Sequence, residues 1–105
     1  MMRRFGQHAV LKRECVEEYK RLHKDVWPKV LEMIKSCHIQ NYSIFLKGDD
    51  LFAYFEYIGN DYDADIKRME ADPITQHWWT YTKPCFATHE KGIYYLEMEE
   101  IFHSE

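Results

Sequence analysis

The sequence predicts an α+β protein of the ferredoxin-like class, in which an antiparallel sheet carries helices on one face. Apolar residues recur at helical spacing in two separate stretches and alternate as in strands in four others. These stretches follow one another in the order strand, helix, strand, strand, helix, strand, which is the βαββαβ pattern of that class. The 105 residues contain no internal repeat and no linker rich in Pro or Gly, so we expect a single domain over residues 1–105.

The first part of the chain predicts a short strand and a long, interrupted helix. Phe5–Leu11 is extended and partly alternating. From residue 13 to about residue 36 the apolar spacing is helical, but Pro28 lacks an amide hydrogen and disfavours helical geometry at Trp27, so the helix should kink or restart there. Asp25 is placed to cap the second half. The stripe that this helix directs at the interior consists of Val16, Tyr19, His23, Val26, Trp27, Val30 and Ile34.

A hairpin is predicted in the middle of the chain. Asn41–Lys47 alternates with β-branched and aromatic residues, Gly48-Asp49-Asp50 is a turn signal, and Leu51–Ile58 is a second aromatic strand. Two helices can cover only one face of this sheet, so the other face should pack on a second copy, and we expect a homodimer. The second strand carries large apolar groups on both faces, Leu51, Ala53 and Phe55 on one and Phe52, Tyr54 and Ile58 on the other.

The remaining third predicts two helices and a last strand. Asp61 is placed to cap a helix that ends before Pro73. A shorter helical segment follows over Ile74 to about Tyr81, and Lys83–Gly92 is predicted as a loop from its Pro and Gly. Ile93–Phe102 is predicted as the last strand, in which Tyr94, Leu96 and Met98 alternate with Tyr95, Glu97 and Glu99.

Charge and cysteine content narrow the classes of function. Fourteen Lys and Arg against 18 Asp and Glu give a net charge of −4, so no general basic field is present to attract nucleic acid or anionic lipid. Cys15, Cys37 and Cys85 are odd in number and far apart, which is typical of reduced thiols. No signal-peptide core and no stretch of transmembrane length are present. We therefore expect a cytoplasmic protein without nucleic-acid or membrane partners.

Tyr19 and His23 are the first candidates for chemistry. They are four residues apart, so on a helix they stack one turn above the other, on a face directed at the interior. A buried phenol and a buried imidazole need polar partners, and two ordinary core residues would satisfy the same pattern, which is the more common case for such a pair alone. An imidazole with a pKa of about 6.5 can both give and take protons at neutral pH.

Tyr42 and the pair Trp78-Trp79 are candidates for binding. Asn41 and Tyr42 point to opposite faces of their strand, and the apolar residues that alternate with Tyr42 place it on the helix-facing side. Neighbours on a helix point about 100 degrees apart, so one indole can pack in the core while the other lines a cleft. An indole face suits the C–H side of a pyranose ring, although an aromatic core cluster would show the same residues.

With these stretches in view, the sequence resembles the L-rhamnose mutarotase family over nearly the whole chain. The motifs are Tyr19-x-x-x-His23 followed by Trp27-Pro28, then Asn41-Tyr42, then Trp78-Trp79, and a Glu-rich end before Phe102. The resemblance implies a dimeric α+β barrel that interconverts the anomers of L-rhamnose by acid–base catalysed ring opening and closure, with no cofactor or metal. It implies that Tyr19, Tyr42, Trp78 and Trp79 bind the sugar and that His23 is the proton donor. Tyr19 and Tyr42 would hold hydroxyls or relay the second proton, and the sequence does not distinguish the two roles.

Alternative functions remain open at this point. L-fucose is also a 6-deoxy sugar, so a fucose mutarotase of the same family is one. A cofactor-free monooxygenase of the dimeric ferredoxin-like type is another, since it also uses His and aromatic residues in a cleft. The strand around Phe52 is faintly similar to that of an RNA-recognition domain, but Asp49 and Asp50 stand where a basic residue and Gly would be expected. The histidines lack metal-site spacing with the cysteines.

Overall fold

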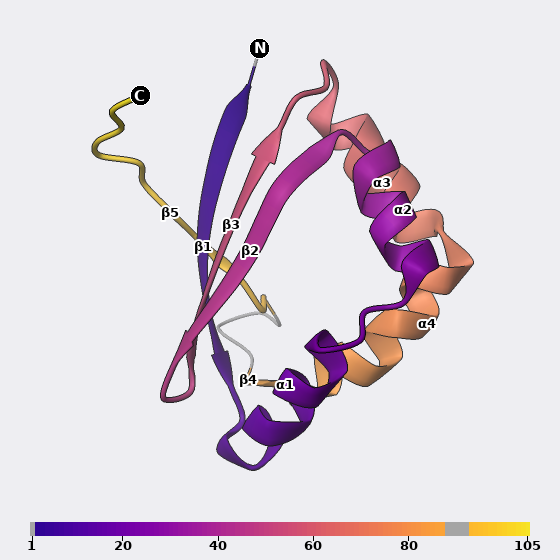
Figure 1. Ribbon diagram of the computed structural model, residues 1–105, viewed down its shortest axis with the longest axis vertical. Coiled ribbons are helices and arrows are strands. Elements are labelled where there is room, and N and C mark those ends of the chain that lie inside the picture. The colour runs from indigo at the N-terminus through magenta and orange to yellow at the C-terminus, as the bar shows by residue number, and fades with distance from the viewer. Residues whose placement is uncertain (1, 88–92) are drawn as a thin grey trace.

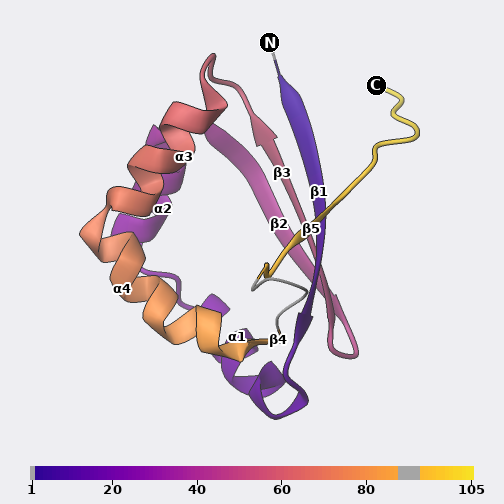
Figure 2. The ribbon, with the colours of Figure 1, turned by 180° about the vertical axis from the view of Figure 1, so that it is seen from behind.

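The computed structural model describes residues 2–87 and 93–105. A sheet and a curved row of helices face each other (Figure 1), and the view from behind shows the helices on one side of that sheet (Figure 2). The elements are β1 (Arg3–Leu11), α1 (Val16–His23), α2 (Pro28–Ser36), β2 (Ile39–Lys47), β3 (Asp50–Tyr57), α3 (Tyr62–Ala71), α4 (Pro73–Thr82), β4 (Phe86–Ala87) and β5 (Leu96–Met98), with short 3-10 helices at Arg13–Cys15 and Lys83–Cys85.

All strand pairs are antiparallel, in the order β2-β3-β1-β4, and β5 also pairs with β1. This confirms the predicted ferredoxin-like α+β class. The extent of the last strand was predicted wrongly, because only Leu96–Met98 of Ile93–Phe102 pairs with β1. Part of the predicted loop Lys83–Gly92 forms the 3-10 turn and β4, and its residues 88–92 lie outside the described part of the chain.

The helical stretch after β1 divides into two helices, as Pro28 predicts. Pro28 takes the first helical position of α2, where no amide hydrogen is needed, and Trp27 before it has extended geometry with φ −60° and ψ 134°. The predicted cap by Asp25 is wrong, because Trp27 occupies the capping position and no side chain caps α2. After the break that follows His23, α1 and α2 take different places in the curved row of helices that faces the sheet (Figure 1).

A bulge in β2 decides which of its residues face the helices. The register shifts between Gln40 and Ser43, and Asn41 has a φ of +52°. Ile39 and Ile44 would lie on opposite faces of a regular strand, since they are five positions apart. The extra residue of the bulge places both on the helix-facing side, where Ile39 is buried and Ile44 packs on the core.

The same bulge separates Asn41 from Tyr42, as predicted. The Asn41 amide donates to Glu56 Oε1 at 2.8 Å, on the side of the sheet away from the helices. The Tyr42 ring packs on Phe55 with 5.4 Å between centroids, and the Phe55 side chain is buried on the helix-facing side. Tyr42 therefore points toward the space between the two layers.

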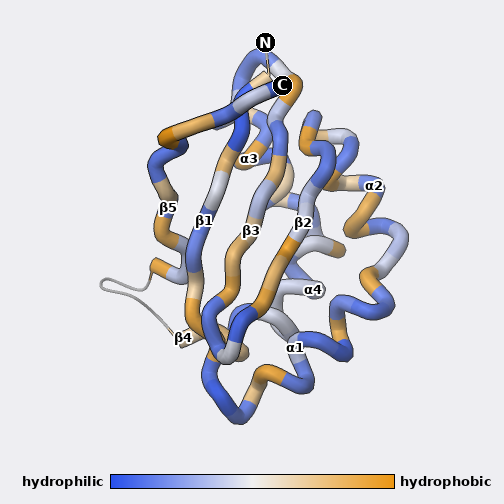
Figure 3. The backbone as a smooth tube through the Cα atoms, turned by 60° about the vertical axis from the view of Figure 1, so that its left-hand side comes forward, coloured by the Kyte–Doolittle hydropathy of each residue, from blue (hydrophilic) through white to orange (hydrophobic). Residues whose placement is uncertain are grey.

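The core lies between the layers, while the outer face of the sheet stays open. On β3 the helix-facing residues Leu51, Ala53, Phe55 and Tyr57 are all buried. Hydrophobic residues alternate with hydrophilic ones along β2, β3 and β5 (Figure 3), and several apolar side chains of the outer face remain accessible. Within these three strands they include Phe45 (65%), Met98 (45%), Leu96 (44%) and Phe52 (38%). No helix in the described ranges is long and apolar enough to cross a membrane.

Candidate functional site

A cavity of about 650 Å³ lies between the helices and the inner face of the sheet. This volume is within the range of about 300–1,000 Å³ that is typical of small-molecule sites. Apolar side chains of α2, β2 and β3 form much of its wall, among them Val30, Ile34, Ile44 and Phe55. The five residues predicted for the site all line it, namely Tyr19, His23, Tyr42, Trp78 and Trp79.

Helix α1 brings Tyr19 and His23 together, as their spacing predicts. Their rings stack with 4.2 Å between centroids, and Tyr19 is only 5% exposed. His23 Nδ1 lies 2.9 Å from the backbone oxygen of Tyr19. A carbonyl oxygen can only accept, so Nδ1 carries the hydrogen and Nε2 is the nitrogen left for another partner.

Burial sets the protonation state of His23. The pKa of His23 is lowered by desolvation, which outweighs the opposing effect of the hydrogen bond to the Tyr19 carbonyl. At neutral pH the imidazole is therefore neutral, and Nε2 has a lone pair that can take a proton. The imidazolium formed in this way can return the proton, so one residue serves as base and then as acid.

Helix α4 presents the two tryptophans at its middle. Asp72 caps the helix by accepting from the Thr75 amide at 2.9 Å and from its hydroxyl at 2.8 Å. Trp78 is 5% exposed and packs its ring against His23 and Trp27, at 5.6 and 5.2 Å between centroids. The cap of α4 by Asp72 was not predicted. The predicted cap of α3 by Asp61 is confirmed, because the Ala64 amide donates to Asp61 Oδ1 at 3.2 Å.

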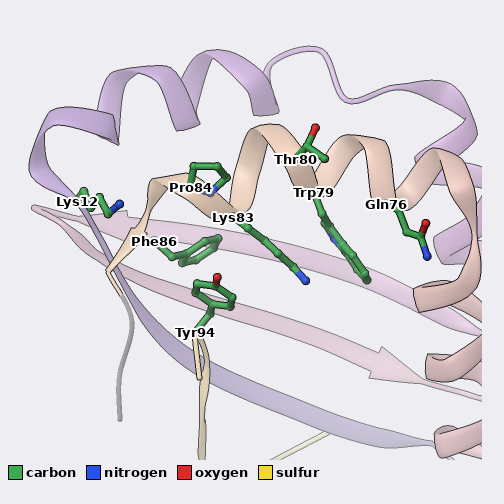
Figure 4. Close-up of a pocket in the computed structure, with 8 residues that line it drawn as sticks. All are labelled: Lys12, Gln76, Trp79, Thr80, Lys83, Pro84, Phe86 and Tyr94. Carbon is green, nitrogen blue, oxygen red and sulfur yellow. The ribbon is translucent and has the colours of Figure 1, made fainter. Parts of the chain in front are cut away.

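Trp79 differs from Trp78 in its surroundings. It is half-buried, and the Lys83 ammonium lies 4.4 Å from the centroid of its ring. Trp79 and Lys83 also line a second hollow of about 460 Å³ at the edge of the cavity. Figure 4 shows the Lys83 side chain directed between the rings of Trp79 and Tyr94. The expectation that one indole packs while the other lines a cleft fits this difference, although both indoles reach the cavity.

Tyr95 also lines the cavity, although it was not among the residues predicted for the site. It packs on the Phe86 ring, as Tyr19 does, with 5.2 and 5.5 Å between centroids, and Tyr42 lines the same cavity. The pKa values of all three phenols are raised, chiefly by burial, so all three are protonated at neutral pH. The sequence feature that bears on the position of Tyr95 is the alternation of the last segment, which places Tyr95 on the same face as Glu97.

Metal ligation has no matching arrangement in the described residues. Nowhere in residues 2–87 and 93–105 do three or more His, Cys, Asp or Glu side chains gather as they would around a metal ion. The cavity instead combines one imidazole, five phenols and two indoles, which can hydrogen-bond hydroxyl groups, stack on a ring and transfer protons.

A family model for L-rhamnose mutarotases matches residues 4–104. The chain belongs to this family. Relatives named L-rhamnose mutarotase include one from Lactiplantibacillus plantarum, 31% identical over 97% of this chain and 98% of its own length. Another, from Listeria monocytogenes, is 36% identical over 83% of this chain and 84% of its own length. As an L-rhamnose mutarotase family member, the protein is an isomerase that acts on carbohydrate, and the predicted resemblance is confirmed.

Solved structures place the mutarotase chain in the same fold. A crystal structure of an L-rhamnose mutarotase from Formosa agariphila superposes with a TM-score of 0.79, at 22% identity over 98% of this chain and 99% of that one. A protein from Nitrosomonas europaea described as an antibiotic biosynthesis monooxygenase gives 0.62 at 12% identity, over 99% and 94%. The monooxygenase alternative therefore has only the fold in its favour, and the mutarotase interpretation has the family as well.

Proposed function

We propose that this protein interconverts the α and β anomers of L-rhamnose in the cavity between its sheet and helices. The observation that carries the proposal is the convergence of the motif residues. Tyr19 and His23 come from α1, Tyr42 from β2, and Trp78 and Trp79 from α4, yet all five line one cavity of monosaccharide size.

Anomer exchange requires the anomeric hydroxyl to lose a proton and the ring oxygen to gain one. We assign the first step to neutral His23, whose Nε2 takes the proton of the anomeric hydroxyl. The bond between the anomeric carbon and the ring oxygen breaks, its electron pair goes to the ring oxygen, and a phenol supplies the proton there. The aldehyde turns about its bond to the second carbon, and closure on the other face returns both protons.

This assignment refines the role that the resemblance implies for His23. With Nδ1–H held by the Tyr19 carbonyl and the pKa lowered by burial, His23 begins as an acceptor. It becomes the proton donor in the closure step, when the imidazolium returns its proton to the oxygen of the new anomer. The proton therefore moves between Nε2 of His23 and the anomeric oxygen in both directions, and the reaction has no net proton change.

The remaining side chains would hold the sugar. The half-buried indole of Trp79 offers a face to the C–H side of the ring, and Tyr42 offers its hydroxyl from the opposite wall. The methyl group of a 6-deoxy sugar would lie against the aliphatic wall of Val30, Ile34 and Ile44. A sugar with a hydroxyl at that position would leave the hydroxyl without a partner there.

A homodimer through the outer face of the sheet is part of the proposal. Four apolar side chains on that face are 38–65% exposed, which is unusual for a surface that stays in water. A second sheet packed on it would bury them, as in other face-to-face sheet pairs. Near the end of the chain, Ile101 and Phe102 are 89% and 81% exposed and would add to the apolar area.

The three unpaired cysteines support a reducing compartment, the cytoplasm.

Saturation-transfer NMR of L-rhamnose tests the function directly. One anomeric signal is saturated, and transfer to the other is measured as the protein concentration is raised. We expect the exchange rate to rise in proportion to protein for L-rhamnose and less for L-fucose or sugars with a hydroxyl at the sixth carbon. An exchange rate for L-rhamnose equal to that of buffer alone would refute the proposal.

A further inference from the structure

The position of Tyr95 is fixed by elements outside the predicted site. The residue precedes β5, whose Leu96 and Glu97 pair with His8 and Gln7 of β1. Alternation places Tyr95 on the helix-facing side with Glu97. The Tyr95 ring packs on Phe86 with 5.2 Å between centroids. The last segment of the chain therefore delivers a phenol to the cavity from the edge of the sheet opposite to β2.

Tyr19, Tyr42 and Tyr95 all line the cavity, and Tyr19 and Tyr95 pack on the same ring, that of Phe86, at 5.5 and 5.2 Å between centroids. Hydrogen bonding with each of the other two phenols contributes to the pKa of Tyr95, which agrees with a row of hydroxyls that has Tyr95 in the middle. Three hydroxyls carry three hydrogens, and two are used in the contacts within the row. When each hydroxyl of the row donates to the next, one hydrogen is left for the sugar, at one end of the row. The Tyr19 end is the one beside His23, since the two rings stack at 4.2 Å. Tyr42 lies on the opposite wall and packs on Phe55.

The geometry of the sugar decides which end of the row, Tyr19 or Tyr42, gives its hydrogen to the ring oxygen. The anomeric oxygen and the ring oxygen are bonded to the same carbon, so the two groups that exchange protons with them must be neighbours. His23 has one such neighbour among the three phenols, Tyr19, one helical turn away. If Tyr19 gives its proton to the ring oxygen, its own oxygen becomes negative in a buried place and needs a donor. Tyr95 packs on the same Phe86 ring as Tyr19 and can be that donor.

We propose that Tyr19 supplies the proton to the ring oxygen and that Tyr95 is a positioning residue, whose hydroxyl donates to the Tyr19 oxygen and stabilises its negative charge. This inference rests on the proposed function of the cavity. In the opening step the Tyr19 proton moves to the ring oxygen as the carbon–oxygen bond breaks, and in closure it returns. The hydrogen bond from Tyr95 opposes the increase that burial causes in the pKa of Tyr19, in keeping with this role.

The test is the exchange rate of Tyr95→Phe at saturating L-rhamnose. The substitution keeps the ring on Phe86 and removes only the hydroxyl. We expect the rate to fall about ten- to a hundred-fold, the range for a lost hydrogen bond to a charged group, with the KM within a few-fold of the parent. Tyr81→Phe, which removes an exposed phenol outside the cavity, is the matched control and should leave the rate unchanged.

A double mutant separates this role from a structural one. Tyr19→Phe removes the proton donor, so adding Tyr95→Phe should slow the reaction no further, because the two hydroxyls act as a unit. Independent losses that multiply would overturn the inference. Tyr95→Leu, which also lacks the hydroxyl, is measured in parallel so that the result does not depend on one variant folding, and melting temperatures accompany each rate.

The outcomes distinguish the inference from the function on which it rests. A parent protein that exchanges L-rhamnose anomers, with Tyr95→Phe within three-fold of it, would overturn the inference and leave the function standing. A parent protein without exchange activity would overturn both.

Discussion

Replacing His23 by Gln tests the centre of the proposed mechanism. Glutamine can still donate a hydrogen bond to the Tyr19 carbonyl but cannot take up a proton at neutral pH. The tyrosines and tryptophans around the cavity stay in place. We therefore expect a folded protein that binds L-rhamnose and exchanges its anomers slowly.

The two energetic effects of this change differ in size. General acid–base help is worth about 10²- to 10⁴-fold, which corresponds to about 2.7–5.4 kcal/mol of activation free energy. The structural loss is the stack on Tyr19 and the edge contact with Trp78, at about 0.5–1.5 kcal/mol for each aromatic pair. One kcal/mol moves the melting temperature of a domain of this size by about 4–8 °C. The loss of rate should therefore far exceed what unfolding at 25 °C could cause.

The pH dependence gives a second measurement on the same residue. The folded pKa of His23 is lowered by burial, below the unfolded value of about 6.5. Neutral His23 therefore makes its full contribution to the free energy of unfolding above about pH 6.5, the unfolded pKa. This contribution is lost as the pH falls through the folded pKa. The exchange rate of the parent should follow the neutral ring, staying level at neutral pH and falling only in mild acid.

The assay is saturation-transfer NMR at several pH values, with thermal melts and sedimentation of both proteins. A rate in His23→Gln within a few-fold of the parent, with fold and oligomeric state intact, would refute the reasoning and assign both proton transfers to the phenols. Lys20→Gln, on an exposed position of the same helix, is the control and should change neither rate nor pH profile.

Three further predictions concern stability and assembly. Trp78→Ala should cost about 3–5 kcal/mol of unfolding free energy because the indole is 5% exposed, whereas Trp79→Ala should mainly weaken sugar binding; equal effects in melts and sugar titrations would contradict this division. Phe52→Asp should shift the protein to monomer in sedimentation at micromolar concentration, since it places a charge in the proposed interface; an unchanged dimer, or a parent that is itself monomeric, would exclude this interface. Asp72→Ala should lower the free energy of unfolding in urea by about 0.5–2 kcal/mol through loss of the α4 cap, while the exposed Lys67→Ala serves as the neutral reference; equal urea midpoints for these two variants would mean that the cap contributes nothing.

Local periodicity in the sequence determined the order and type of the elements. Each helix and each hairpin strand buries one face, and the spacing of apolar residues records that face directly. The pairing of Tyr19 with His23 followed from their separation of one helical turn, and the restart at Pro28 from its missing amide hydrogen. The family motifs could be read for the same reason, since most of them lie within single elements.

The tertiary structure decided what depends on contacts between distant segments. The bulge at Asn41 arises where β2 meets β3 and keeps both Ile39 and Tyr42 on the cavity side. The edge of β1 is shared, with Val10 and Leu11 paired to β4 and Gly6 to His8 paired to β5, so the predicted last strand is short. This pairing between the two ends of the chain brings Tyr95 onto the Phe86 ring on which Tyr19 also packs. Such register is set by the summed packing of both partners, which no local window of the sequence contains.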